Sequence, residues 1–166
     1  MAYALSSVQL GLQPLLTTDT VQNHPLGTII KGRDPTYGEG EFIYLKGIGS
    51  TVAGSIVNYF PDTYTTALGY VGENVAAPMA IAMSANVASQ YGWYQISGVA
   101  TASKSCAVSF AAGAKVAVST STGIAVATIS GNELQGAVVA AVASATAGRT
   151  TVRLMINRMH LQGRVT

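Results

Sequence analysis

Charged side chains are scarce in this sequence. Aspartate, glutamate, lysine and arginine make up 10% of its 166 residues, against about 25% in an ordinary globular domain. Apolar residues stand at 49%, close to the usual share, so the deficit falls on the surface. Alanine, glycine, serine and threonine must cover that surface, and such small side chains pack against another surface at little entropic cost. The composition favours a protein that works inside an assembly, with a small-residue-rich soluble β protein as the alternative.

Cysteine is nearly absent, and so are the signals of export. Cys106 is the single cysteine and cannot form an internal disulfide. The sequence has no Asn-x-Ser/Thr acceptor site, and its first residues lack the basic region of a secretory signal. The uncharged stretch 74–103 contains proline, asparagine and glutamine, so we expect no membrane span. Assembly in a reducing cytoplasm is the expectation.

Groups that could perform catalysis are few. His24 and His160 have no cysteine or carboxylate at a metal-ligand spacing. Glu39 and Glu41 are two residues apart, so an extended chain places them on one face, as a glycosidase pair requires. No third polar group supports them, and no G-x-S-x-G elbow occurs. We expect no enzyme, no metal and no cofactor, and we keep a small glycan hydrolase as a weaker alternative.

Arginine dominates the end of the chain. Past Glu133 the charged residues are all arginines, at positions 149, 153, 158 and 164. Such a tail could bind phosphates, but the four are spread out and no aromatic residue lies between them for base stacking. Ion pairing within or between subunits is therefore the expected use, with no direct contact to nucleic acid.

The pattern of the chain changes near residue 40. Prolines at 14, 25 and 35 interrupt the first forty residues, where apolar side chains come in short bursts. From residue 41 onward, strand-length runs alternate with turn residues, and only "ANVASQY" allows a short helical turn. The sequence predicts a mainly β protein: an extended N-terminal arm over 1–40 and a single β-barrel or β-sandwich domain over 41–166.

Period-two patterns predict the faces of two strands. In one, Trp93, Gln95 and Ser97 alternate with the residues between them, so the neighbouring Tyr94 and Ile96 belong to the other face. In the other strand, three apolar residues alternate with three others, which indicates one buried face: Val152, Leu154 and Ile156 against Arg153, Met155 and Asn157.

Candidate contact residues come from both ends of the chain and from its single tryptophan. A proline-broken arm cannot bury its own apolar side chains, so we expect them to meet a partner surface. Trp93 is either a core residue or an anchor on the partner, and the core role is favoured. The arginines would orient more than they attract. The candidates are Leu12, Leu15, Leu16, Leu26, Ile29, Ile30, Trp93, Arg153 and Arg158.

Several stretches between Gly27 and Val139 resemble the small capsid cement or decoration proteins of tailed bacteriophages. They are "YGEGEFIYLKGIGSTVAGSIVNY", "DTYTTAL", "PMAIAMSANVASQYGWYQISGVATA", "GAKVAVSTSTG" and "GNELQGAVV". The likeness is strongest at "SANVASQYGWYQISG", and most of the arm and the arginine tail lie outside it.

The resemblance implies a structural role. Proteins of this kind are mainly β, lie on the outside of the icosahedral head, and reinforce the joints between major capsid subunits. The expected partners are the major capsid protein and other copies of the chain, as a homotrimer, and the expected location is the virion. A tail or head-fibre module that binds a host receptor is the alternative, because such a module is also β-rich and trimeric.

Overall fold

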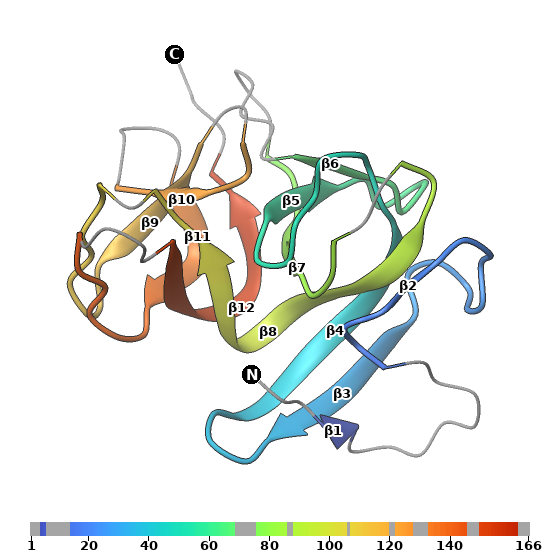
Figure 1. Cartoon of the computed structure of the whole chain (residues 1–166), viewed down its shortest axis with the longest axis horizontal. Helices are drawn as coiled ribbons and strands as arrows, with labels where there is room; N and C mark the ends of the chain where they lie inside the picture. Colours follow the sequence, from blue (N-terminus) through green and yellow to red (C-terminus); the bar gives the residue numbers. More distant parts are fainter. Residues whose placement is uncertain are drawn as a thin grey trace.

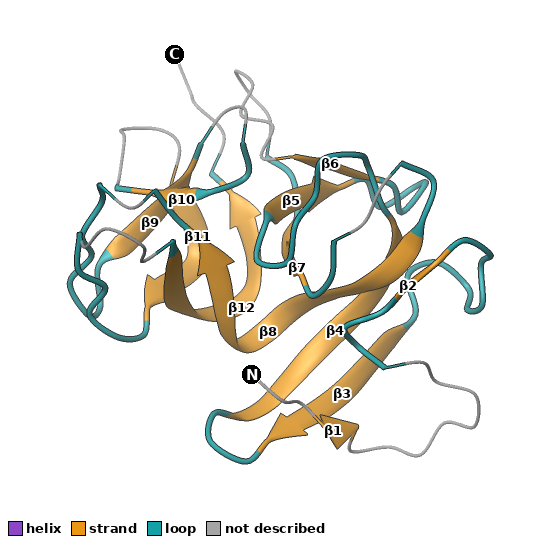
Figure 2. Ribbon diagram, in the orientation of Figure 1, coloured by secondary structure: helices purple, strands orange, loops and turns teal. Residues whose placement is uncertain are grey.

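The computed structural model consists of strands and turns, with no helix in the part of the chain that it describes (Figure 2). That part comprises residues 4–5, 14–68, 76–85, 88–105, 107–119, 122–127, 133–145 and 150–162. The predicted mainly β fold is confirmed. The predicted helical turn at 85–91 includes residues 86–87, which lie outside the described ones.

All the strand pairs are antiparallel, and they join into one strongly curled sheet (Figure 1). Its main path runs in the order β1-β3-β4-β8-β12-β11-β9-β10, with β2, β5, β6 and β7 attached beside it. The strands are β1 (Ala4–Leu5), β2 (Thr18–Asp19), β3 (Ile29–Asp34), β4 (Gly38–Lys46), β5 (Ile56–Tyr59), β6 (Thr66–Leu68), β7 (Met79–Ala82), β8 (Tyr91–Ser103), β9 (Lys115–Val118), β10 (Ala125–Val126), β11 (Glu133–Val139) and β12 (Thr151–Leu161).

Strand β8 belongs to both halves of the molecule. Its first half pairs with β4, from Lys46↔Tyr91 to Glu41↔Ser97, and its second half pairs with β12. Between the two halves, Gly98 has a φ of +96°, and a side chain there would collide with the carbonyl oxygen of Glu39. Glycine is needed at this point because it tolerates the left-handed region and leaves room for the neighbouring backbone.

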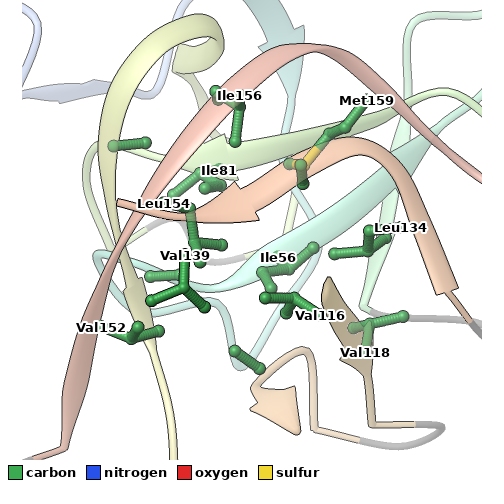
Figure 3. Close-up of a cluster of buried hydrophobic side chains, with 14 of the residues drawn as sticks. Ile56, Ile81, Val116, Val118, Leu134, Val139, Val152, Leu154, Ile156 and Met159 are labelled. Carbon is green, nitrogen blue, oxygen red and sulfur yellow. The ribbon is translucent and has the colours of Figure 1, made fainter. Parts of the chain in front are cut away.

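The second half of β8 curls into a half-barrel with β12, β11, β9, β10, β5 and β7. The amide nitrogen of Ile56 donates to the carbonyl oxygen of Gly123 at 2.7 Å, which joins β5 to the segment before β10. Aliphatic side chains fill the interior (Figure 3). On β12 the predicted alternation is confirmed, with 152, 154 and 156 buried and 153, 155 and 157 exposed. The main packing groups include Ile56, Ile81, Val116, Leu134, Val139, Val152, Leu154, Ile156, Met159 and Leu161.

The first half of β8 has a separate apolar cluster on each face, as the alternation predicted. Tyr94 and Ile96 pack with β5 and β7, whereas Trp93 packs on the opposite face. The cluster around Trp93 contains Leu15, Ile30, Phe42 and Tyr44, with Leu26, Met83 and Tyr91 packed against it.

The sheet begins before residue 40. Residues of β3 pair with β4 from Ile29↔Ile43 to Asp34↔Gly38, so the expected boundary between arm and domain falls inside β4. Asp34 is 3% exposed, and its Oδ1 accepts hydrogen bonds from the backbone N–H groups of Thr36 and Tyr37 at 2.8 and 3.0 Å. These bonds form an aspartate-stabilised turn at the tip of the hairpin.

Candidate interaction surface

The segment 14–28 packs on the molecule's own sheet. Leu15 and Ile30 are buried in the cluster around Trp93, and Leu26 lies partly buried against it. These side chains therefore pack against their own chain. Among the apolar candidates of the arm that the structure describes, Leu16 and Ile29 point outward, at 61% and 42% exposed. The candidate Leu12 lies outside the described residues.

Trp93 belongs to the core. It is fully buried, and its ring centroid lies 5.0 Å from that of Tyr44. His24 sits above both rings, at 5.1 Å from Tyr44 in an edge-on contact and at 5.5 Å from Trp93. Tilted and edge-on aromatic pairs add to the apolar burial, so this group holds the 14–28 segment on the sheet.

The two described arginines of the tail connect β12 to the β3–β4 hairpin. Arg158 donates to Oε2 of Glu41 at 3.0 Å from Nη2 and at 3.3 Å from Nε. Arg153 donates to the hydroxyl of Tyr37 at 2.9 Å, and its guanidinium lies 5.5 Å from the centre of that ring. Arg158 thus forms an ion pair with an acid of its own chain. Arg149 and Arg164 lie outside the described residues.

Glu39 and Glu41 line one polar hollow, and they lie on one face, as their spacing predicted. The other walls are Lys31 and Gly40 of the hairpin, Ser97 of β8, and Asn157 and Arg158 of β12. Lys31 pairs with Glu41 across the hairpin, and Arg33 pairs with Glu39. Basic and acidic groups therefore alternate over this surface, and Glu41 is engaged by Arg158.

A second hollow, of about 310 Å³, lies on β11 and β12 and shares Asn157 with the polar one. We call it the β11–β12 hollow. Its walls are mainly apolar, with Val138 and Met155 41% and 48% exposed. On the register, Val138 lies opposite Met155 and also opposite Lys115 of β9.

A bulge shapes the β11–β12 hollow. Gln135 pairs with His160 and Ala137 pairs with Ile156, so Gly136 alone faces the three residues 157–159. Gly136 and Arg158 both have positive φ, +77° and +43°. A side chain on Gly136 would press against the carbonyl oxygen of Asn157. Bulges of this kind re-aim side chains and interrupt a ladder, and here the bare glycine forms part of the lining of the hollow.

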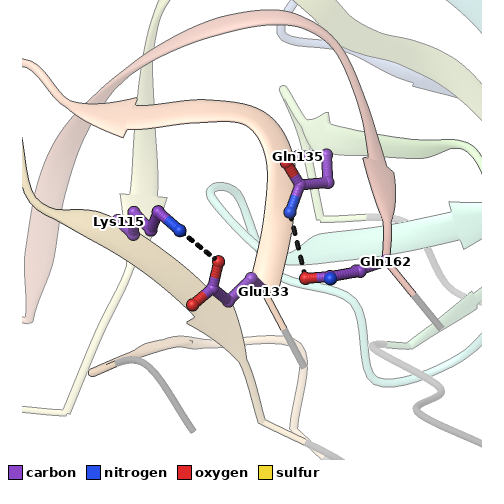
Figure 4. A network of polar contacts seen from close by, with 4 residues as sticks. All are labelled: Lys115, Glu133, Gln135 and Gln162. Carbon is purple, nitrogen blue, oxygen red and sulfur yellow. Dashed lines mark hydrogen bonds and ion pairs between the residues drawn. The ribbon is translucent and has the colours of Figure 1, made fainter. Parts of the chain in front are cut away.

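Polar pairs mark one rim of the β11–β12 hollow (Figure 4). The Lys115 ammonium lies 2.9 Å from Oε2 of Glu133, and Gln135 donates through Nε2 to Oε1 of Gln162 at 3.0 Å. The Lys115 side chain is 68% exposed. Such an ion pair is screened by solvent and contributes little to stability, so the exposed ammonium of Lys115 can also meet an acid of a second molecule at low cost.

The sequence alone did not reveal this hollow. "LQGAVV" reads as a strand with an interior glycine, and a glycine within a strand is a signal for a bulge. That signal does not tell which residues stand opposite the glycine. The alternation of Met155 with Leu154 and Ile156 predicted that Met155 is exposed. It did not predict that the exposed Val138 lies opposite Met155.

The described residues hold no group of three or more histidines, cysteines or acids close enough to share a metal ion. Across the same residues no helix is long and apolar enough to span a membrane. Cys106 lies outside them. No protein-family model matches the chain, and no curated protein matches its sequence.

Proposed function

We propose that this chain is a structural protein of a phage virion, one that decorates the outside of the head and cements neighbouring major capsid subunits. The observation that carries the proposal is the exposure of large apolar side chains on ordered strands and turns, in a chain with only 10% charged residues. They include Leu16, Val21, Ile29, Ile48, Val52, Phe60, Val138, Val142 and Met155.

Exposed apolar groups on strands and hydrogen-bonded turns suit an assembly contact. Each gains free energy when a partner removes it from water, about 1.5–3 kcal/mol for a fully buried side chain, which exceeds the cost of about 0.5–1.5 kcal/mol for ordering a side chain. A protein that binds only the assembled shell stabilises that state by mass action, and many copies multiply a modest contact. No chemical step is required of any residue.

The polar hollow supports the same role. Glu41 is bound to Arg158, and Lys31 and Arg33 stand opposite the two glutamates. A glycosidase needs one carboxyl group free to donate a proton and the other free to attack or activate water. The pairing therefore favours a structural use of Glu41, as a link between the hairpin and β12.

The test compares capsid shells with and without the purified protein. We expect saturating protein to raise the temperature at which shells release their contents, and electron cryomicroscopy to show it on the outer surface. A paired assay on host cells addresses the alternative, a receptor-binding module. Unchanged shell stability at full occupancy, or specific binding to host cells without binding to shells, contradicts the cement role.

A further inference from the structure

Phe60 is an aromatic side chain held out into solvent. Among the described phenylalanine, tyrosine and tryptophan side chains it alone is exposed, at 44%. It begins the turn after β5, and that turn is well hydrogen-bonded. The Phe60 N–H donates to the carbonyl of Thr65 at 3.0 Å, and the N–H of Tyr64 donates to the carbonyl of Phe60 at 2.7 Å.

The rest of the turn is anchored to the protein. Tyr64 packs against the cluster that contains Tyr94, and its ring covers Gly27. Pro61 fixes the backbone directly after Phe60. The backbone of the turn is therefore held in place, and a partner that covers the ring has only the two side-chain torsions of Phe60 to order. Phenylalanine, like the other aromatic residues, is enriched at protein–protein interfaces.

The β11–β12 hollow offers what such an anchor needs. Its exposed walls are Val138 and Met155, and Gly136 adds no side chain. Phe60 of the same chain is not among the residues that line the hollow, so its ring does not fill the hollow. Its volume of about 310 Å³ is enough for one aromatic ring. Lys115 lies at the rim with its side chain 68% exposed.

We infer that Phe60 of one copy of this chain inserts into the β11–β12 hollow of a second copy. Charge complementarity supports the pairing, because Asp62 is exposed two residues after Phe60, and Lys115, the more exposed partner of the Lys115–Glu133 ion pair, lines the hollow. The carboxylate of Asp62 would meet the ammonium of Lys115 while the ring covers Val138 and Met155. The inference goes beyond the proposed function, since it concerns two copies of the chain whether or not either binds a capsid.

Two variants of the full chain separate the two sides of the contact. Phe60→Asp removes the ring, and Met155→Asp places a charge in the hollow. Each is expected to weaken self-association by about 30-fold, the loss typical of a hot-spot residue. Val21→Asp is the matched control, because Val21 is 69% exposed and belongs to neither element. Sedimentation velocity over a concentration series measures the association, and circular dichroism with thermal melting confirms that each variant is folded.

Mixing the two variants gives the decisive measurement. Phe60→Asp keeps an intact hollow and Met155→Asp keeps an intact ring, so one good contact forms only between unlike chains. With two different affinity tags, we expect unlike pairs to co-purify and to dominate the native mass spectrum, while each variant alone stays monomeric. A monomeric wild type at high concentration overturns the inference. So does undiminished association of either folded variant, or a mixture that forms no unlike pairs. None of these outcomes depends on binding to shells.

Discussion

The ammonium nitrogen of Lys104 lies 2.8 Å from the carbonyl oxygen of Val108, and the lysine is only 3% exposed. The same nitrogen donates to the carbonyl oxygens of Ser105 at 3.1 Å and Ser144 at 3.3 Å. Three backbone carbonyls thus satisfy the three donors of a buried ammonium group. The side chain ties the end of β8 to the loop that follows it and to the segment after β11.

Replacing Lys104 by methionine is expected to destabilise the protein. The change keeps the apolar stem but leaves carbonyl groups without a donor, at a cost of about 1–3 kcal/mol for a buried unsatisfied group. Urea denaturation measures the change in the free energy of unfolding. Lys115→Met is the matched control, because its ion pair is exposed and worth about 0–1 kcal/mol. Equal effects of the two substitutions would show that the carbonyl contacts do not matter.

Leu15 and Leu16 are adjacent in sequence but differ in exposure, at 6% and 61%. Leu15→Ala is expected to lower the free energy of unfolding by about 2–4 kcal/mol, because it leaves a cavity beside Trp93. Leu16→Ala is expected to change it by less than about 0.5 kcal/mol. Thermal melting of the two variants measures the difference. If both are neutral, the 14–28 segment is not part of the folded core.

Asn58 is fully buried, and neither atom of its side-chain amide has a hydrogen-bond partner among the residues that the structure describes. Ile56 and Val57, the two residues that precede it in β5, are also fully buried. Asn58→Leu is therefore expected to stabilise the protein by about 1–2 kcal/mol, since it removes the desolvation cost of a polar group at similar volume. A raised urea midpoint with an unchanged slope confirms this. A lowered midpoint means that the amide has a role which an apolar side chain cannot replace.

Burial raises the pKa of the Tyr59 hydroxyl above its usual value of 10.0, and the positive charge of Arg158 partly offsets this effect. The unfolded chain therefore loses the tyrosine proton at a lower pH than the folded one. The stability that this group contributes is present below pH 10 and is lost as the pH rises through the folded pKa. Tyr59→Phe is expected to flatten the fall in the urea midpoint as the pH rises above 10. Identical pH profiles for the two proteins contradict the assignment.

Local patterns were enough to predict the faces of β12 and β8, but not β3, which was expected to belong to an extended arm. The alternation of Val152, Leu154 and Ile156 identified the inward face of β12, and the residues around Trp93 identified both faces of β8. These patterns arise from a period of two along one strand, so they require no knowledge of its neighbours.

Features that depend on pairing between distant strands could not be predicted in this way. Arg158 adopts a positive φ and resets the alternation, so Met159 turns inward after Asn157 and Arg158 both face outward. The prolines at 14 and 25 correctly indicated irregular backbone, but an irregular segment still packs when a sheet offers an apolar face. The position of the β11–β12 hollow follows from the register of Gly136 against β12, which no single segment encodes.

The sharing of β8 between the two halves of the molecule determines the order in which the fold can be completed during synthesis. The ribosome makes β4 before β8, so the first half of β8 has its partner as soon as it emerges. The second half must wait for β12, which is made after β9, β10 and β11. Translation adds about 5–20 residues per second, so this edge stays unpaired for seconds, and an unpaired strand edge is a template for aggregation. The growing chain is thus most vulnerable after β8 has been made, and the addition of β12 ends that interval.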